Sequence, residues 1–459
     1  MMISWFDRLA ARGGLLRSVL ILAGGAAGAQ LVMAAAMPVL SRLYSPADFG
    51  QLAVFSGLVL TISVAACLRW DIAIALPEAD ADAFGLLVLS VASCLVISLL
   101  GLLAVTSATA TFVDWLDQPE AATWLWLVPP AVLAVATGSA LQNWFIRAQN
   151  FGLISKARLS QAGTSGSLQI AFGLSGIGVI GLLMGYVAAA IVVVGFLGFQ
   201  LFKQSHDLQL ALNTANLRRL ASTYSRFPAF STWEALSNVA AIHVPVILIA
   251  GKVGNDIAGQ LMLAMYVIQA PMGLIGGAIS QVYLSEAPSR LRVGRLDQFT
   301  LEVLGKLCKV GVGPLVAIGV LSPSVFWIVF GSEWEKAGLL IAWMTPWFVL
   351  QFLASPVSMA LHVTGNQRAA MSFQFFALCL RVFSVLWAAE VWPGLVGEAY
   401  AISGFFVYSN YLLIVAHSLR IRPGALAGVL AKNLLWSLPW IICGAMLAWT
   451  IHNYSGLAS

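Results

Sequence analysis

The sequence predicts an all-α membrane protein that crosses the bilayer many times. Of its 459 residues, 60% are hydrophobic and only 9% are charged, whereas soluble domains carry about 25% charged residues. The apolar runs are continuous over about 20 residues, the length that a helix needs to cross a bilayer. A transmembrane β-barrel would instead show alternation over strands of about 10 residues, so this class is excluded.

Thirteen segments qualify as candidate membrane spans. Their approximate limits are 15–42, 49–76, 83–112, 121–146, 152–174, 177–202, 224–250, 257–285, 303–330, 337–362, 369–391, 395–418 and 426–451. The first segment has the Arg residues and small side chains of a signal peptide. We interpret it as an uncleaved span, because its apolar run is too long and twelve more follow. The last is the least regular, since Lys432 and Asn433 interrupt its start.

The positions of Lys and Arg predict the orientation, because cytoplasmic loops are enriched in both. With a cytoplasmic N-terminus, only Arg42, Lys252 and Lys336 fall outside, and Arg381 falls within a span. The other twenty of the 24 basic residues then lie near the cytoplasmic side. After thirteen spans the C-terminus is periplasmic. This bias explains the net charge of +5, so no nucleic-acid partner is needed.

Short matches between the two halves of the chain indicate an internal repeat. Gly50-Gln51-Leu52 after the first span corresponds to Gly259-Gln260-Leu261 after the seventh. Two acidic turns, 117–122 and 332–338, each open a later span, and Asn150 corresponds to Asn366. Parallel repeats are common in secondary transporters. The predicted division is an N-terminal six-helix lobe (1–202), a cytoplasmic linker (203–223), a second six-helix lobe (224–418) and an extra helix (419–459).

Ionisable side chains inside predicted spans mark candidate functional positions, because burying a charge in a bilayer is costly. Arg226, Glu234 and Asn238 share a broad face of span 224–250. At 1.5 Å per residue, Glu234 and Arg381 lie about 15 and 16 Å from the same end of their spans. We expect these two side chains to pair or to face one polar chamber. A purely structural ion pair is the alternative.

Two further spans carry unusual patterns. Ser155, Arg158, Ala162, Ser165 and Gln169 fall within one narrow arc of span 152–174. Such a stripe indicates a water-filled cavity or helix packing through small residues, and both interpretations remain open.

The second pattern lies in span 257–285, where four residues predict a bend that serves as a moving gate. They are Pro271, Gly273, Gly276 and Gly277.

The sequence shows none of the signatures of a membrane enzyme. It has no long external loop, no nucleophile–base pair, no Asp-x-Asp motif and no Gly-rich phosphate loop. The five cysteines have no metal or redox spacing. These observations favour a carrier over a glycosyltransferase or polymerase, and they predict no cofactor and no metal site.

Three stretches resemble the Wzx-type oligosaccharide flippases of the multidrug/oligosaccharidyl-lipid/polysaccharide (MOP) flippase superfamily. They are SRLYSPADFGQLAVF with RWDIAIALPEADADA (41–83), RFPAFSTWEALSN with PMGLIGGAISQVYLSEA (226–287), and the segment 330–363. The resemblance implies two six-helix lobes in a V-shaped, MATE-like arrangement around a central cavity. It also implies alternating access in the cytoplasmic (inner) membrane. A thirteenth helix departs from the commoner twelve or fourteen.

The resemblance also implies the cargo and its contacts. The expected cargo is an oligosaccharide linked to undecaprenyl pyrophosphate for surface polysaccharides such as lipopolysaccharide or exopolysaccharide. Membrane lipids, a polysaccharide polymerase and chain-length proteins are the other expected partners. Arg158, Arg226 and Arg381, with Ser165 and Gln169, are the candidate cargo contacts. Glu234 and Asn238 lie on the helix that carries a cation site in related flippases, so coupling to Na⁺ or H⁺ stays open. The alternative functions are a cation-coupled multidrug antiporter and a glycan polymerase.

Overall fold

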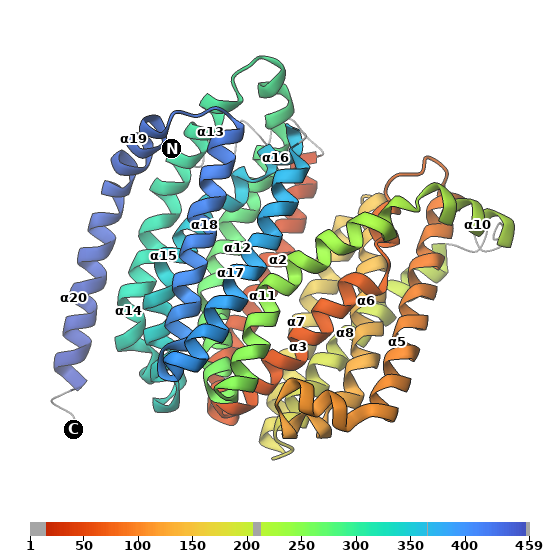
Figure 1. The fold of residues 1–459 in the computed structure, drawn as a ribbon, viewed down its shortest axis with the longest axis horizontal. Helices are drawn as coiled ribbons and strands as arrows, with labels where there is room; N and C mark the ends of the chain where they lie inside the picture. The colour runs from red at the N-terminus through yellow and green to blue at the C-terminus, as the bar shows by residue number, and fades with distance from the viewer. Residues whose placement is uncertain (1–14, 205–212, 365, 456–459) are drawn as a thin grey trace. The chain divides into compact units, whose positions relative to one another are not determined.

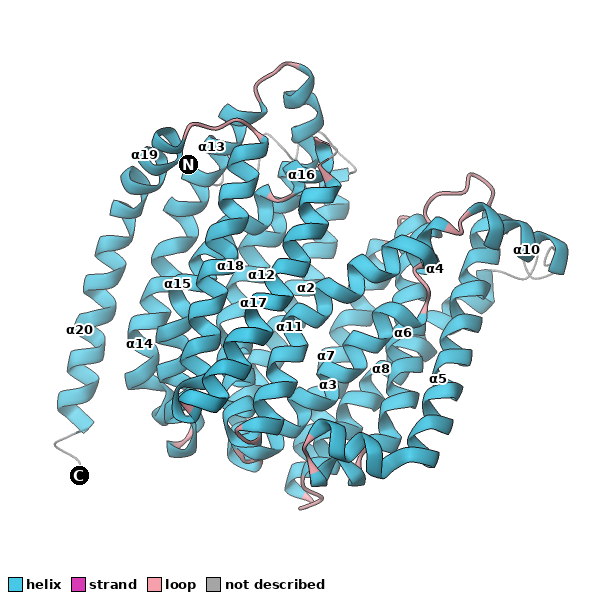
Figure 2. Cartoon of the chain, viewed as in Figure 1, coloured by secondary structure: helices cyan, strands magenta, loops and turns pink. Residues whose placement is uncertain are grey.

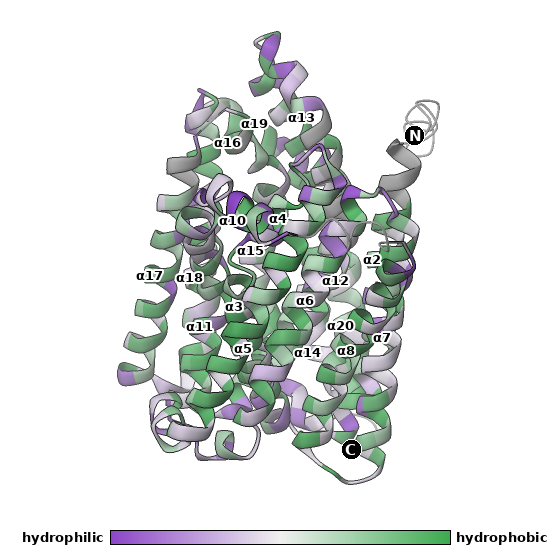
Figure 3. Ribbon diagram, turned by 90° about the vertical axis from the view of Figure 1, so that its right-hand side faces the viewer, coloured by the Kyte–Doolittle hydropathy of each residue, from purple (hydrophilic) through white to green (hydrophobic). Residues whose placement is uncertain are grey.

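The computed structural model describes residues 15–204, 213–364 and 366–455, and every regular element in these ranges is helical (Figures 1 and 2). Hydrophobic residues cover most of the length of the long helices, and hydrophilic residues gather toward helix ends and connections (Figure 3). An α-helix satisfies its backbone hydrogen bonds internally, which a segment in lipid requires. The predicted all-α class is therefore confirmed.

Eleven helical segments in the described ranges are long and apolar enough to cross a membrane. Two further long helices, α7 (Phe151–Leu174) and α12 (Asn255–Arg292), carry more polar side chains and lie outside this group. With them the helices correspond in order to the thirteen predicted spans. The main helices of the eleven segments are α2 (Leu15–Leu43), α3 (Pro46–Ala66), α5 (Asp80–Leu116), α6 (Val128–Arg147), α8 (Val179–Gln204), α11 (Thr232–Lys252), α14 (Gly313–Phe330), α15 (Glu335–Val357), α17 (Gln367–Val391), α18 (Val396–Ser418) and α20 (Leu438–Ser455).

Shorter elements extend or join these helices. They are α4 (Trp70–Ala73), α10 (Thr214–Thr223), α13 (Leu296–Leu307), α16 (Met359–Val363) and α19 (Pro423–Leu434), with the π-helical turns η3 (Phe227–Ser231) and η4 (Cys308–Val312). The thirteenth span consists of α19 and α20, joined by the 3₁₀ turn η7 (Leu435–Ser437). This turn follows Lys432 and Asn433, the two residues that make the start of the span irregular.

Two details of the predicted spans need correction. The second span ends at Ala66 rather than near residue 76, because Leu68 and Arg69 adopt left-handed φ values of 49° and 59°. That conformation is unfavourable for L-residues and ends a right-handed helix. The eighth span is not interrupted at Pro271, since α12 continues past both Pro271 and Pro288.

The chain forms two compact units, each built from two stretches of sequence. Unit 1 comprises Met1–Ala36 and Gln51–Gly251, and unit 2 comprises Met37–Gly50 and Lys252–Ser459. The end of α2 and the first turn of α3 thus pack with unit 2, whereas α11 packs with unit 1. The sequence-based lobes at 1–202 and 224–418 describe the repeat, and their boundaries stay a prediction.

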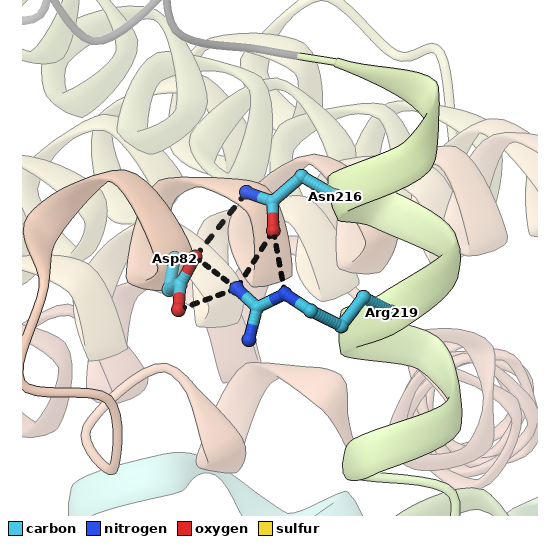
Figure 4. A network of polar contacts seen from close by, with 3 residues as sticks. All are labelled: Asp82, Asn216 and Arg219. Atoms are coloured by element: carbon cyan, nitrogen blue, oxygen red, sulfur yellow. Dashed lines mark hydrogen bonds and ion pairs between the residues drawn. The ribbon is translucent and has the colours of Figure 1, made fainter.

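In unit 1, α5, α6, α7 and α8 form the packed layer. The amphipathic helix α10 lies against α5, with Leu220 buried against Gly85. Beside this apolar contact, Arg219 Nη2 lies 2.7 Å from both carboxylate oxygens of Asp82 (Figure 4). Asn216 Nδ2 also donates to Asp82 Oδ1 at 3.2 Å. The described part of the predicted linker is therefore fixed to this unit.

In unit 2, α15 is the central helix and packs against α12, α14 and α18. Its side chains Trp347, Phe348 and Phe352 are each at most 2% exposed. The last helix, α20, packs against α14, and α17 packs against α18. Helix α15 thus brings its aromatic residues into the centre of this unit, next to α18.

The Gln residues of the two Gly-Gln-Leu triplets each form a hydrogen-bonded junction with a later segment. In unit 1, Gln51 Oε1 accepts from Trp124 Nε1 at 3.0 Å, just after the acidic turn 117–122. In unit 2, Gln260 Oε1 accepts from the Ala337 amide at 2.8 Å, and its Nε2 donates to the Glu333 carbonyl. In both halves, the Gln of the Gly-Gln-Leu triplet therefore connects its helix to a residue in or just after an acidic turn.

Candidate functional site

Among the residues whose side chains the structure describes, two charged ones are buried, one in each unit. Arg381 on α17 is 3% exposed, and Asp71 on α4 is 5% exposed. Charged side chains are almost never fully buried without a partner that compensates for lost hydration. These two positions are therefore the first candidates for a function. Sequence reasoning predicted the first and missed the second.

Three aromatic rings of unit 2 surround the guanidinium of Arg381, and we call this group the Arg381 cage. The guanidinium carbon lies 4.9 Å from the ring centre of Trp347 on α15. It lies 5.8 Å from the ring centres of Tyr400 and Tyr408 on α18. A cation held over aromatic faces gains about 0.5–2 kcal/mol, and most when it is desolvated. The cage thus offsets part of the cost of burying Arg381.

The sequence of α18 explains how these rings meet. Tyr400 and Tyr408 are eight residues apart and therefore lie about two turns apart on one face. Between them, Gly404 leaves room for the indole of Trp347 against the helix backbone. The Trp347 and Tyr400 rings meet edge to face, with centroids 5.2 Å apart. The Trp347 Nε1–H donor is buried without a hydrogen-bond partner, so the cage holds an unused donor beside a cation.

Among the predicted cargo contacts on α7, Gln169 packs against a neighbouring helix. It is 3% exposed, and its Nε2 donates to the Leu182 carbonyl of α8 at 3.1 Å. Ser155 Oγ similarly donates to the Ile21 carbonyl of α2 at 2.8 Å. Ser165 is buried and Arg158 is half-buried. For Ser155 and Gln169 the packing interpretation of the polar stripe therefore describes the observed contacts.

The candidates on α11 lie on a more accessible segment. Arg226 is exposed and directly precedes the π-helical turn η3. Glu234 is half-buried and Asn238 is exposed, one turn apart on the same helix face. Lipid cannot satisfy an amide, so this face requires water or a polar partner. The pairing of Glu234 with Arg381 stays a prediction, because the two residues belong to different units.

The predicted gate residues lie within the continuous helix α12. No described atom lies within 4 Å of the position that a Cβ on Gly273 would occupy, and a Cβ on Gly276 would lie 3.8 Å from the Phe352 ring. The surroundings of Gly277 lie outside the described residues. Pro271 is half-buried. The gate itself stays a prediction.

The position that sequence reasoning missed is Asp71. Its Oδ2 accepts hydrogen bonds from Asn143 Nδ2 at 3.2 Å and from Ser139 Oγ at 3.5 Å, both on α6. Its Oδ1 is buried without a partner. Burial raises the pKa of Asp71, and the nearby charge of Arg69 opposes that shift. The signal was present, because Asp71 lies inside the predicted span 49–76.

Comparisons with solved structures place the fold of the chain among those of polytopic membrane proteins. The structure of "Lipid II flippase MurJ, inward closed conformation" matches with a TM-score of 0.72, 12% identity, and coverage of 96% of this chain and 100% of that chain. An inward-facing multidrug resistance MATE family transporter matches with a TM-score of 0.65, 13% identity, and coverage of 92% and 96%. At this identity the likeness shows the fold.

The family model described as "Polysaccharide biosynthesis protein" matches residues 39–338, and the chain belongs to this family. No curated protein matches the sequence. The predicted resemblance to Wzx-type MOP flippases is thus confirmed by the family and by the fold.

Proposed function

We propose that the chain is a flippase that moves an oligosaccharide linked to undecaprenyl pyrophosphate across the cytoplasmic membrane. Family membership supports a role in polysaccharide biosynthesis. One protein with the same fold is named a lipid II flippase. The proposed protein is a carrier that works by alternating access and supplies glycan for a surface polysaccharide. A polymerase and chain-length proteins are its proposed partners.

The observation that carries this proposal is the sign and setting of the buried charge in unit 2. Arg381 is cationic, and Trp347 adds an unused N–H donor beside it. Pyrophosphate oxygens and sugar hydroxyls are acceptors that suit such a group, and Arg binds phosphate with two parallel hydrogen bonds. A site selecting cationic drugs would instead need exposed carboxylates or aromatic faces that no protein cation already occupies.

The enclosure of Arg381 constrains the mechanism. At 3% exposure the guanidinium cannot touch a large cargo in this conformation, so it must become accessible during the cycle. Arg158 and Arg226, which are half-buried and exposed, are the proposed earlier contacts, with Ser165 and Gln169 on the same helix as Arg158. Outward movement of an anion is favoured by about 2.3 kcal/mol per charge per 100 mV of inside-negative potential. The potential is therefore a proposed driving force, and Glu234 with Asn238 is the proposed place for ion coupling.

The first test is export of the glycan by cells that carry Arg381→Ala or Arg381→Lys. We expect at least about a tenfold loss with Ala, equivalent to about 1.4 kcal/mol, at normal membrane abundance. Lys keeps the charge but lacks the bidentate geometry, so its export should be intermediate. Arg290→Ala removes a guanidinium that is exposed near the end of α12 and serves as the control. Normal export by an abundant Arg381→Ala protein contradicts the role of this residue.

The second test distinguishes the cargo classes on the purified protein. Lipid-linked oligosaccharide should raise the unfolding temperature of the wild type but not that of Arg381→Ala. A cationic drug should have no effect on either. Stabilisation by cationic drugs alone would favour the multidrug antiporter and would reject the proposed cargo.

A further inference from the structure

Asp71 is the one carboxylate among the buried residues that the structure describes. The side chains that hydrogen-bond to it are neutral, the amide of Asn143 and the hydroxyl of Ser139, and the backbone amides of Asp71 and Ile72 also favour its ionised form. Both side-chain bonds reach Oδ2, and Oδ1 has no partner. These donors compensate only in part for the hydration that an ionised carboxylate loses, so burial favours the neutral form.

The ionisable groups on the surrounding elements do not reverse this preference of Asp71 for its neutral form. On α5, Cys94 contacts Cys67, and this hydrogen bond raises the pKa of the Cys67 thiol, which keeps it neutral. Asp80 and Asp82, at the start of α5, pair with Arg147 and Arg219. The turn η3, which also packs against α4, contains no ionisable side chain. Arg69 is the charged group that acts on Asp71.

Arg69 itself lies in a strained turn with an unsatisfied atom. Leu68 and Arg69 both adopt left-handed backbone conformations, which are costly for residues with a Cβ. Arg69 Nε is buried without a hydrogen-bond partner. One turn of the chain therefore holds an orphan donor on a cation and an orphan acceptor on a carboxyl group, two residues apart. If the turn relaxed, Arg69 Nε could donate a hydrogen bond to Asp71 Oδ1.

We propose that Asp71 is a reversible proton-binding site with two states. In the observed state the carboxyl group is neutral and buried against Asn143 and Ser139. In the second state the O–H bond of Asp71 breaks, the proton passes to water, and the carboxylate pairs with Arg69 after the Leu68–Arg69 turn rearranges. Helix α4 packs against η3, the turn that precedes α11. A rearrangement of the Leu68–Arg69 turn could therefore shift α11, the helix that carries Glu234. That link to transport rests on the proposed function, whereas proton binding does not.

The site is tested on the purified full chain in lipid nanodiscs. Unfolding temperatures are measured from about pH 4 to about pH 9 for the wild type and Asp71→Asn, which mimics the neutral acid. A carboxyl group with a raised folded pKa stabilises below its unfolded pKa and loses that contribution as pH rises through the folded value. The wild type should therefore lose several degrees relative to Asp71→Asn as pH rises. Glu78→Gln, which removes an exposed carboxylate nearby, should follow the wild type.

Two further measurements keep the proposal open to contradiction even if Asp71→Asn folds poorly. Arg69→Gln should move the pH transition upward, because the charge that favours ionisation is gone. An infrared band of a protonated carboxyl group should disappear in Asp71→Asn but remain in Glu78→Gln. A wild type that gains stability over Asp71→Asn with rising pH, or a constant difference, would show a permanently ionised Asp71 and overturn the proposal.

The role in transport has its own readout. Glycan export by Asp71→Asn should lose its dependence on external pH, while Glu78→Gln should keep it. Unchanged export with a normal titration of Asp71 would reject the link to transport but not the proton site. Failure of lipid-linked oligosaccharide to stabilise the wild type would reject the cargo while leaving the titration intact.

Discussion

Gly50 of α3 and Gly259 of α12 lie in direct backbone contact, and each belongs to the Gly-Gln-Leu triplet of its own sequence repeat. A Cβ on Gly259 would lie 2.8 Å from the Gly50 nitrogen and would also collide with the Pro46 carbonyl. A Cβ on Gly50 would meet the Asn255 backbone. Helices approach this closely only where neither has a side chain. The repeat has therefore placed its two matching glycines at one helix crossing within unit 2.

Gly259→Ala should strongly destabilise the protein, because the obstructing atoms belong to the backbone and cannot rotate away. Overpacking costs about 1–3 kcal/mol. Gly273→Ala, on the same helix, meets no described atom within 4 Å and should be neutral or stabilising by up to about 1 kcal/mol. Thermal unfolding of the two purified variants measures the contrast. Equal stability of both variants would refute the close crossing.

Gly273→Ala is also a test of the gate on α12. If the helix bends during transport near Pro271, a residue with lower flexibility at Gly273 should slow export while leaving stability intact. We expect a several-fold reduction in export at wild-type abundance. Gly254→Ala serves as a contrast, because Gly254 has a φ of 124° outside the helix and its substitution should lower stability through backbone strain. Full export by Gly273→Ala would argue against bending at this position.

The two Gln junctions predict matched losses in the two units. Gln51→Ala leaves the buried Trp124 Nε1 without an acceptor, and Gln260→Ala leaves the Ala337 amide without one. An orphaned buried donor costs about 1–3 kcal/mol. Gln298→Ala, at an exposed position of α13, should change stability by less than about 0.5 kcal/mol. Chemical unfolding in mild detergent compares the three, and a loss confined to one junction would show that the repeat is not energetically symmetric.

The sequence was most informative where a signal lay within one segment. Continuous apolar runs located the helices, and the spacing of the Gly-Gln-Leu triplets indicated a repeat. Arg381 stood out because it is a charge in mid-span. Its aromatic partners did not, since Trp347, Tyr400 and Tyr408 lie on other helices and look like ordinary membrane aromatics.

Other features depended on packing that no single segment contains. The stripe on α7 fits a cavity and a helix interface equally well, and only the bond from Gln169 to Leu182 separates them. The setting of Asp71 also depends on such packing, because its partners Asn143 and Ser139 lie on another helix, α6. Asp71 follows the left-handed turn at Leu68 and Arg69. The side chains of these two residues do not predict such a turn.

The attachment of α10 to α5 predicts that a buried Leu outweighs a visible ion pair. The side chains of Arg219 and Asp82 are 56% and 25% exposed, and exposed pairs contribute about 0–1 kcal/mol and weaken with salt. Leu220 is 1% exposed, and truncation of a buried Leu to Ala costs about 2–5 kcal/mol. Leu220→Ala should therefore release α10 and open the segment 213–223 to limited proteolysis at any ionic strength. Arg219→Gln should do so only weakly, and at high salt its resistance should match that of the wild type. Protection of Leu220→Ala equal to that of the wild type would show that the polar network in Figure 4 holds the helix instead.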